Sequence, residues 1–118
     1  LLAVLAQRLV KKNCPHCLVE ETISEYVRKD LGIDPHEVFY RGSGCDKCHG
    51  RGHAGRMAVY ELLHLTAELR DMIKPKVNAS DIERKASELG MVPLTQHALS
   101  LARQKLTSIE DVYRVSLS

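Results

Sequence analysis

Apolar residues at the start of the chain recur with a helical spacing. The recurring residues are Leu2, Leu5, Ala6 and Leu9. They fall at positions i, i+3, i+4 and i+7, the period at which side chains return to one face of an α-helix. We therefore predict an amphipathic helix over residues 1–12 and expect its apolar stripe to bury against another part of a larger protein.

The next apolar positions predict one helix and two short strands. Residues 20–31 carry a helical apolar face, and Gly32 is a typical residue to end the helix. Residues 38–40 and 57–60 have the β-branched and aromatic side chains of strands. We expect these two strands to pair as a hairpin around the glycine-rich segment 42–55.

The rest of the chain has a helical pattern. A short helix is predicted from residue 66 until Pro75 ends it. Ser80 with Glu83 forms a capping box, a side-chain arrangement that opens a helix, and Gly90 would end that helix.

Two further helices are expected near the end of the chain. The first has its apolar face at Leu94, Ala98, Leu101 and Ala102. The second follows a capping box of Thr107 and Glu110. We predict an α+β, mostly helical fold. It would comprise a helix over residues 1–12, a tetracysteine lobe with a short hairpin over 13–60, and a small helical bundle over 61–118.

All four cysteines occur in two Cys-x-x-Cys pairs, Cys14 with Cys17 and Cys45 with Cys48. Each pair can present two thiolates from one tight turn, and two such turns complete the tetrahedron that Zn²⁺ prefers. Four thiolate ligands leave no position for water or substrate, so a structural zinc is favoured over a catalytic one. Redox or disulfide behaviour and an iron–sulfur centre remain alternatives.

The residues around the cysteines fit that interpretation. Gly44 and Gly50 would let backbone amides approach the sulfurs of Cys45 and Cys48. The nearby histidines are His16, His49 and His53. Because four cysteines already complete a zinc site, we expect these histidines to be exposed or solvated rather than ligands.

Composition and charge exclude several classes of function. The chain is 44% hydrophobic and 27% charged with a net charge of +2, as in an ordinary globular protein. One Zn²⁺ with four thiolates would bring that charge to about zero, so we expect no nucleic-acid partner. The apolar first ten residues are too short to span a bilayer, and no signal peptide is evident, so we expect no direct membrane insertion and a reducing compartment.

No catalytic constellation stands out. The glycines between residues 42 and 55 are not followed by the Gly-Lys-Ser/Thr of a phosphate-binding loop. Ser43, Ser100 and His97 have no triad context, and His97 fits a surface or half-buried packing role. The acidic pairs at 20–21 and 110–111 look like helix-start charges. We therefore predict no catalytic residue and no nucleotide site in these residues.

An ordered series of motifs extends over essentially the whole chain. The motifs are Leu-Ala-Gln-Arg-Leu-Val at 5–10, Gly-Cys-Asp-Lys-Cys at 44–48, Gly-Arg-Met-Ala-Val-Tyr-Glu-Leu-Leu at 55–63, Gly-Met-Val-Pro-Leu at 90–94, and Thr-Ser-Ile-Glu-Asp-Val-Tyr-Arg-Val at 107–115. Together they resemble the secretion ATPases of type II secretion and type IV pilus assembly. The sequence departs from the family's usual pattern at Leu18, His53 and Lys105, where glycine, an aromatic residue and glycine, respectively, are common.

The resemblance implies a larger protein of which this chain is the C-terminal part. The family consists of hexameric, cytoplasmic ATPases at the bacterial inner membrane, whose tetracysteine module carries zinc. ATP and Mg²⁺ would bind upstream of Leu1, and hydrolysis would power type II secretion or pilus extension. The implied partners are the ATPase core, neighbouring subunits of a homohexamer, and inner-membrane platform proteins.

A second interpretation comes from one short motif. Residues 45–52 match the Cys-x-x-Cys-x-Gly-x-Gly repeat of DnaJ-type chaperones. Only one copy is present, whereas those proteins carry four, so a chaperone-like or zinc-ribbon module for binding protein or nucleic acid is the alternative function.

Overall fold

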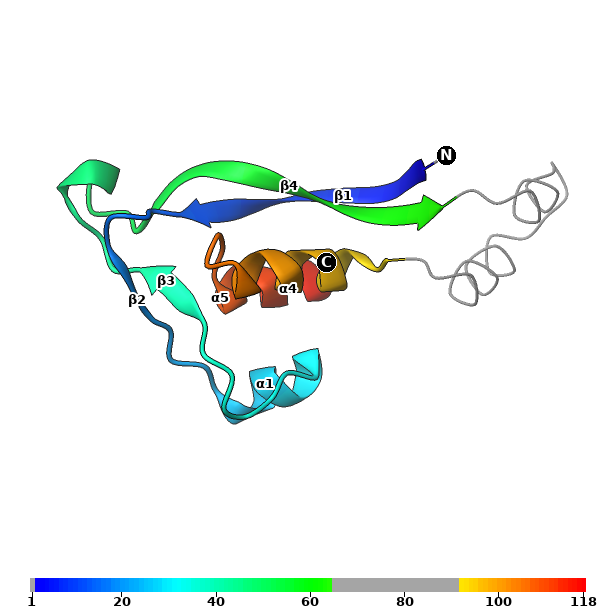
Figure 1. Cartoon of the computed structure of the whole chain (residues 1–118), viewed down its shortest axis with the longest axis horizontal. Coiled ribbons are helices and arrows are strands. Elements are labelled where there is room, and N and C mark those ends of the chain that lie inside the picture. The colour runs from blue at the N-terminus through cyan, green and yellow to red at the C-terminus, as the bar shows by residue number, and fades with distance from the viewer. Residues whose placement is uncertain (1, 65–91) are drawn as a thin grey trace, which may run out of the picture.

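The computed structural model describes residues 2–64 and 92–118, and it shows a small α+β fold (Figure 1). The strands are β1 (Leu2–Asn13), β2 (Leu18–Glu20), β3 (Tyr40–Gly42) and β4 (His53–His64). The helices are α1 (Glu25–Leu31), α4 (Leu94–Arg103) and α5 (Ile109–Ser116), with a 3₁₀ turn over Asp46–Cys48. The α+β class is confirmed, and the predicted helices between residues 66 and 90 lie outside the described residues.

The predicted helix over residues 1–12 is wrong, because this segment is strand β1. It pairs antiparallel with β4 along a long ribbon, from Leu2 opposite His64 to Asn13 opposite His53. Short apolar runs fit a helix or a strand equally well, and here the partner strand, 40 residues or more further along the chain, decides. The exposure of Leu9, at 46%, and the complete burial of Val10 show alternation between two faces.

The predicted hairpin is also wrong, since its two strands belong to different sheets. β3 pairs antiparallel with β2, and β4 pairs with β1. The two-stranded sheets follow one another along the chain, and the cysteine turns lie where one ends and the other begins (Figure 1).

Helix α1 begins later than predicted. Residues 18–20 form β2, and the helix covers only Glu25–Leu31 after Ser24 as its N-cap. Gly32 ends it with a backbone φ of 67°, as predicted. The left-handed conformation is inexpensive for glycine and satisfies the last carbonyls of the helix.

The helices α4 and α5 pack against one face of the β1–β4 ribbon (Figure 1). The buried core joins the ribbon, these helices and the segment around α1: Val10, Leu31, Ile33, Phe39, Val59, Ala98, Leu99, Leu101, Ala102, Ile109, Val112 and Val115. Side chains from all three predicted segments therefore share one hydrophobic cluster. The division at residues 12 and 60 stays a prediction.

The N-terminus of α5 differs by one residue from the predicted capping box. Ser108 is the N-cap, and its hydroxyl accepts from the Asp111 amide at 3.2 Å. The Thr107 hydroxyl is fully buried and donates to the Lys11 carbonyl at 2.7 Å. Thr107 therefore connects the loop before α5 to strand β1.

Helix α5 and the loop before it cover the free edge of β1. The Lys11 amide donates to the Asp111 carboxylate, and Arg114 donates to the Leu9 carbonyl at 2.9 Å. With Thr107 on the Lys11 carbonyl, side chains take the positions that a third strand's backbone would occupy. Covering an edge in this way blocks its pairing with other chains.

Lys105 adopts a left-handed backbone with φ of 67°, which few non-glycine residues adopt. This conformation explains why glycine suits the position. Two contacts with residues of β1 and β3 accompany this conformation. The Asn13 side-chain amide donates to the Lys105 carbonyl at 3.2 Å, and the Lys105 ammonium lies 4.8 Å from the centre of the Tyr40 ring.

The backbone conformation predicts the order of two variants at this position. Lys105→Gly and Lys105→Ala both remove the cation–π contact, but only alanine carries a Cβ into the left-handed region. We expect Lys105→Gly to be the more stable by about 1 kcal/mol in chemical denaturation. Equal stability of the two variants would show that the left-handed conformation is not retained.

Candidate metal centre

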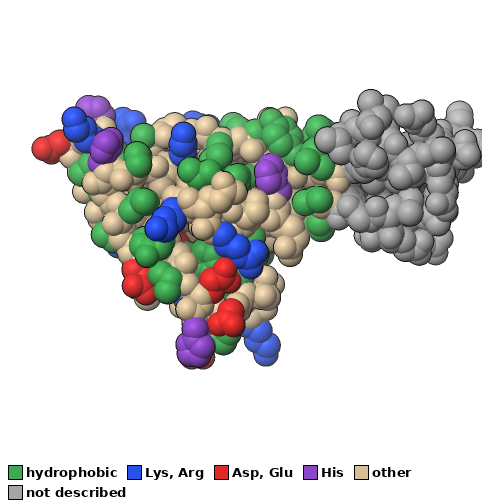
Figure 2. Space-filling view, in the orientation of Figure 1, with side chains coloured by type: hydrophobic (Ala, Val, Ile, Leu, Met, Phe, Trp, Pro, Cys, Tyr) green, Lys and Arg blue, Asp and Glu red, His purple; other side chains and the backbone are tan. Residues whose placement is uncertain are grey.

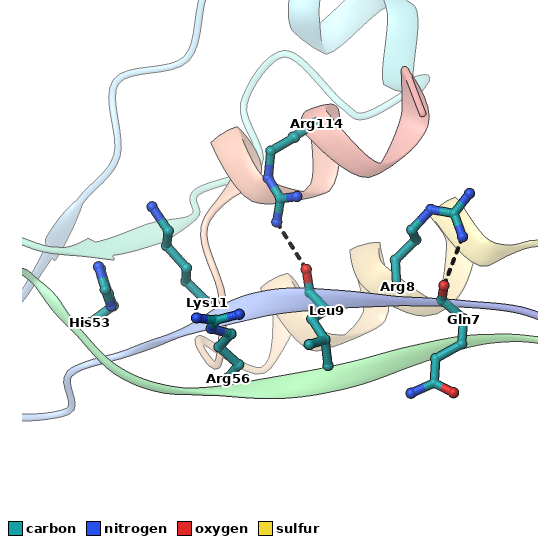
Figure 3. Close-up of a pocket in the computed structure, with 7 residues that line it drawn as sticks. All are labelled: Gln7, Arg8, Leu9, Lys11, His53, Arg56 and Arg114. Carbon is teal, nitrogen blue, oxygen red and sulfur yellow. Dashed lines mark hydrogen bonds between the residues drawn. The ribbon is translucent and has the colours of Figure 1, made fainter.

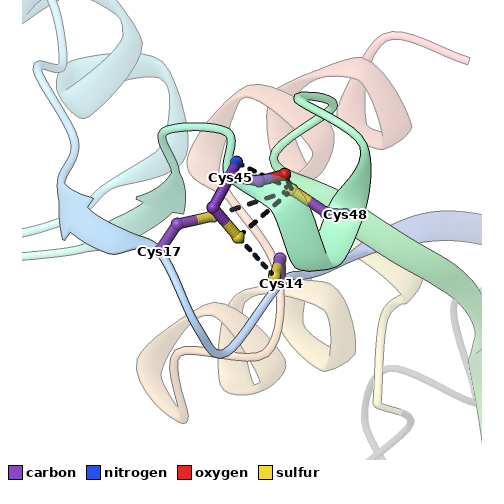
Figure 4. A group of neighbouring side chains, drawn as sticks. All are labelled: Cys14, Cys17, Cys45 and Cys48. Carbon is purple, nitrogen blue, oxygen red and sulfur yellow. Dashed lines mark hydrogen bonds between the residues drawn. The ribbon is translucent and has the colours of Figure 1, made fainter.

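The structure brings the four predicted cysteines together at the junction of the two sheets (Figure 4). Cys14 and Cys17 flank the turn between β1 and β2. Cys45 and Cys48 flank the 3₁₀ turn between β3 and β4. All four Sγ atoms lie within 4.8 Å of one another, so the segments meet in space although 27 residues separate the two pairs.

The sulfur–sulfur distances match a tetrahedral metal site. Cys14 and Cys45 are 3.8 Å apart, Cys17 and Cys48 are 3.9 Å apart, and Cys45 and Cys48 are 3.8 Å apart. A zinc–sulfur bond of about 2.3 Å implies tetrahedral edges of about 3.8 Å. The same distances are nearly twice the roughly 2.05 Å of a disulfide bond, and all four cysteines are free. The arrangement could hold one metal ion.

Backbone amides point at the sulfurs of Cys48 and Cys17, among others. Cys48 Sγ accepts from the amides of Cys45 and Gly52, each at 3.2 Å, and Cys17 Sγ accepts from the Gly44 amide at 3.4 Å. The predicted approach of amides at Gly44 and Gly50 to the sulfurs of Cys45 and Cys48 is wrong in its partners, because the Gly44 amide donates to Cys17. The Gly50 amide donates instead to the Cys45 carbonyl at 2.8 Å.

Close backbone packing explains two glycines beside the site. A Cβ on Gly42 would lie 1.8 Å from the Gly52 carbonyl oxygen, and one on Gly52 would lie 2.4 Å from the Gly42 oxygen. Neither position can accept a side chain without moving the backbone. This contact brings the end of β3 against the start of β4 and so brings Cys45 and Cys48 toward the first pair.

Ionisation is unevenly distributed over the thiols. Burial opposes ionisation of Cys48, but the amides of Gly52 and Cys45 and the neighbouring thiols outweigh it and lower the pKa of Cys48 to about 6. For Cys14, the His16 amide favours the thiolate, yet burial and the other three thiols raise its pKa to about 11. The cluster therefore resists ionisation at Cys14, and a bound divalent cation would favour the thiolate form.

Basic and histidine side chains gather at the end of the molecule that carries the cysteine turns (Figure 2). Lys47, His49 and Arg51 are exposed there, and so is His16, whereas His53 is half-buried. Among the described residues, the candidate ligand group contains the four sulfurs and no histidine nitrogen. The basic groups lie where they would offset the charge of four thiolates.

Glu21 has a role that the sequence did not reveal. It was expected to mark the start of the helix at 20–31, but its carboxylate accepts the Ile109 amide at 2.7 Å and the Glu110 amide at 3.1 Å. These amides open α5, so Glu21 caps a helix 88 residues further along the chain. The contact fixes the segment after the first cysteine pair to α5.

Other predicted polar residues have structural roles. His97 on α4 is half-buried, accepts the Tyr60 amide of β4 at 2.8 Å and stacks on the Tyr60 ring, which agrees with its predicted packing role. The Ser100 hydroxyl donates to the His97 carbonyl, and the Ser43 hydroxyl donates to the Cys17 carbonyl. Asp111 covers the β1 edge. These groups hold neighbouring elements in place.

The family of this chain follows from comparison with known proteins. The family described as "Type II/IV secretion system protein" matches residues 1–114. The chain belongs to this family. The resemblance noted in the sequence is thereby confirmed.

Individual relatives agree with this assignment. The chain is 37% identical to the type IV pilus assembly ATPase PilB of Thermus thermophilus, over 95% of this chain and 13% of that protein. It is 34% identical to the type IV pilus assembly ATPase TfpB of Acinetobacter baylyi, over 98% of this chain and 20% of that protein. It is also 34% identical to the type II secretion system ATPase E of Vibrio cholerae, over 98% of this chain and 23% of that protein. The chain thus spans less than a quarter of each of these relatives.

The buried position of Glu21 predicts a pH effect on stability. Burial raises the pKa of Glu21 above 4.5, against the influence of the two amides. A carboxyl group with a raised pKa in the folded chain contributes most at low pH, and its contribution declines as the pH rises through that pKa. We expect Glu21→Gln to remove this decline, measured by urea unfolding from about pH 4 upward.

The matched control is Glu20→Gln, since Glu20 directly precedes Glu21, is exposed and ends strand β2. It should leave the pH profile unchanged. A Glu21→Gln variant whose profile has the same slope as the unmodified chain would contradict the assignment.

Proposed function

We propose that this chain is a zinc-binding, non-catalytic part of a motor ATPase for type II secretion or type IV pilus assembly. The observation that carries the metal assignment is the cluster of four sulfurs, whose separations of 3.8–3.9 Å match the edges of a thiolate tetrahedron. Cys14, Cys17, Cys45 and Cys48 would be the four ligands.

The position of the cluster supports a structural role. Four protein ligands leave a zinc ion no open position for water or substrate, so its chemistry at this site would be cross-linking. The cysteines lie where three parts of the fold meet: β1, β4 and the β2–β3–α1 segment. The first pair follows β1, the second pair precedes β4, and the Cys14 amide donates to the Gly52 carbonyl at 3.1 Å. The ligands would fix the β2–β3–α1 segment to the end of the long ribbon.

The motor role rests on the family and on the names of the relatives, which are ATPases of pilus assembly and secretion. In this proposal ATP and Mg²⁺ bind elsewhere in the whole protein, which is a homohexamer at the cytoplasmic side of the inner membrane. Residues 13–60 form the metal lobe, and residues 61–118 pack on the ATPase core or a neighbouring subunit. Platform proteins of the machine are its partners.

Some further observations bear on this proposal. Among the described residues, no helix is long and apolar enough to cross a membrane. The chaperone alternative rests on one copy of a repeat, and the family match over residues 1–114 favours the motor.

The metal proposal predicts the content and stability of the purified chain. We expect one zinc per chain by elemental analysis, and a Co²⁺-substituted sample with the visible spectrum of a tetrahedral tetrathiolate site. Cys17→Ser should lower metal affinity by at least tenfold and unfold the β2–β3–α1 segment, followed by circular dichroism and amide exchange.

His16→Ala is the control, because His16 is exposed and lies between Cys14 and Cys17. It should retain one metal and the same Co²⁺ spectrum. Unchanged folding after complete metal removal would reject the structural role.

The motor proposal is tested separately in the full-length ATPase. We expect Cys17→Ser to abolish pilus assembly or secretion while ATP binding by the protein is retained, because the cysteine cluster is not part of a nucleotide site. Loss of ATP binding in this variant, with the remainder of the protein folded, would contradict a non-catalytic role.

A further inference from the structure

A groove runs between the edge of β1 and helix α5 (Figure 3). Its volume is about 830 Å³. We call it the basic groove, and its lining residues are Gln7, Arg8, Leu9, Lys11, His53, Arg56 and Arg114. Four of these side chains are permanently cationic, and no acidic side chain of the described residues belongs to the lining.

Two of the cations face each other across the ribbon. Lys11 and Arg56 are direct partners in the β1–β4 register. Both are exposed, and the described residues offer neither side chain an ion pair or a hydrogen bond. Like charges directly opposite one another destabilise an antiparallel pair. This pair therefore favours an anion beside it.

The other two cations are held in place. Arg114 donates to the Leu9 carbonyl at 2.9 Å, and Arg8 donates to the Gln7 carbonyl at 2.8 Å and to the Ser118 hydroxyl at 3.3 Å. These carbonyl and hydroxyl acceptors fix the guanidinium groups without neutralising them, and Arg114 has a further contact with the Asp111 carboxylate at 3.4 Å. The groove thus has two positioned cations and two that lack a partner among the described residues.

Among the described residues, the Asp111 carboxylate lies close to the groove. Asp111 is 6% exposed, accepts the Lys11 amide, and lies 3.4 Å from Arg114. It offsets one of the four positive charges and is itself buried, so the groove keeps an excess of positive charge. The whole chain with metal would be close to neutral, so this excess is local.

The shape and lining favour one class of anion. A concave groove between a strand edge and a helix fits a narrow chain segment better than a flat membrane surface. No Phe, Tyr or Trp lines it, so it lacks the stacking platforms that single-stranded nucleic acids use. Leu9, 46% exposed, adds an apolar contact between the cations. The backbone amide and carbonyl of Leu9 both face the edge of β1 that borders α5, because the two groups of one residue face one side in an antiparallel ladder.

We propose that the basic groove binds an acidic segment of a partner protein, with carboxylates on Lys11 and Arg56 and an apolar side chain on Leu9. The cations come from β1, β4 and α5, and the apolar side chain of Leu9 lies among them, which suits an Asp- and Glu-rich peptide and not a compact phosphate. This surface is independent of the proposed metal, since its variants leave all four cysteines in place.

The test is fluorescence anisotropy with the metal-loaded chain and a labelled ten-residue peptide rich in Glu and Leu. A peptide with Gln in place of Glu is the second probe. We expect the acidic peptide alone to bind, and its affinity to fall as salt is raised. Lys11→Gln and Arg56→Gln should each weaken binding by about three- to tenfold.

The same variants have a stability readout. Because each removes one of two facing like charges, neither should lower the thermal midpoint, so weaker binding would not reflect unfolding. Lys29→Gln on α1 is the matched control, since Lys29 is exposed and outside the groove, and it should leave binding unchanged.

Two competitors separate the acidic segment from other anions. Inorganic phosphate and a short oligonucleotide, added at constant ionic strength, should displace the peptide no better than chloride. Displacement by phosphate alone, equal binding of the Gln peptide, no measurable binding, or unchanged affinity in both groove variants would each overturn the proposal.

Discussion

The antiparallel pairing of β1 with β4 positions nearly everything else in this molecule. Two strands of twelve residues run side by side and end at Asn13 and His53. The chain leaves one strand directly into Cys14 and enters the other directly after the turn that carries Cys48. The ribbon therefore brings two distant Cys-x-x-Cys turns to one place. It does so through the backbone, so the cluster depends on register as much as on cysteine chemistry.

A strand pair of this length needs protection at its edges, and α5 supplies part of it. Asp111, Thr107 and Arg114 bond the backbone of β1 at Lys11 and Leu9. Glu21 in turn bonds the first amides of α5. The cysteine-bearing segment, the ribbon and the C-terminal helix are thus joined by polar contacts as well as by one hydrophobic cluster. Separating these three parts would leave the polar groups in each contact without their partners, which opposes separation.

Charged groups gather in two places, at the cysteine cluster and in the basic groove. Burial and the neighbouring thiols oppose ionisation of Cys14, and basic side chains gather at the end of the molecule that carries the cysteine turns. Positive charge also continues along β1 to the groove between Lys11, Arg56 and Arg114, well beyond the sulfur cluster. The chain therefore combines a small net charge with a strongly positive local surface.

Several features were predictable because their signals are local. The cysteine spacing, the glycine that ends α1, and the apolar faces of α4 and α5 each depend on neighbours within a few residues. The family motifs were equally visible. The predictions that were wrong depend on long-range pairing. The apolar spacing at 2–9 suits either a helix or a strand, and the two predicted hairpin strands pair with other strands.

The sequence by itself therefore determined the four candidate ligands, the family and the C-terminal helices. Tertiary structure alone decided that residues 2–13 are a strand and that Glu21 caps α5. It also decided that Asn13 bonds the carbonyl of the left-handed Lys105 and that Lys11 faces Arg56. The physical reason is the same in each case. The two groups that interact lie tens of residues apart, so no local periodicity or capping rule can pair them.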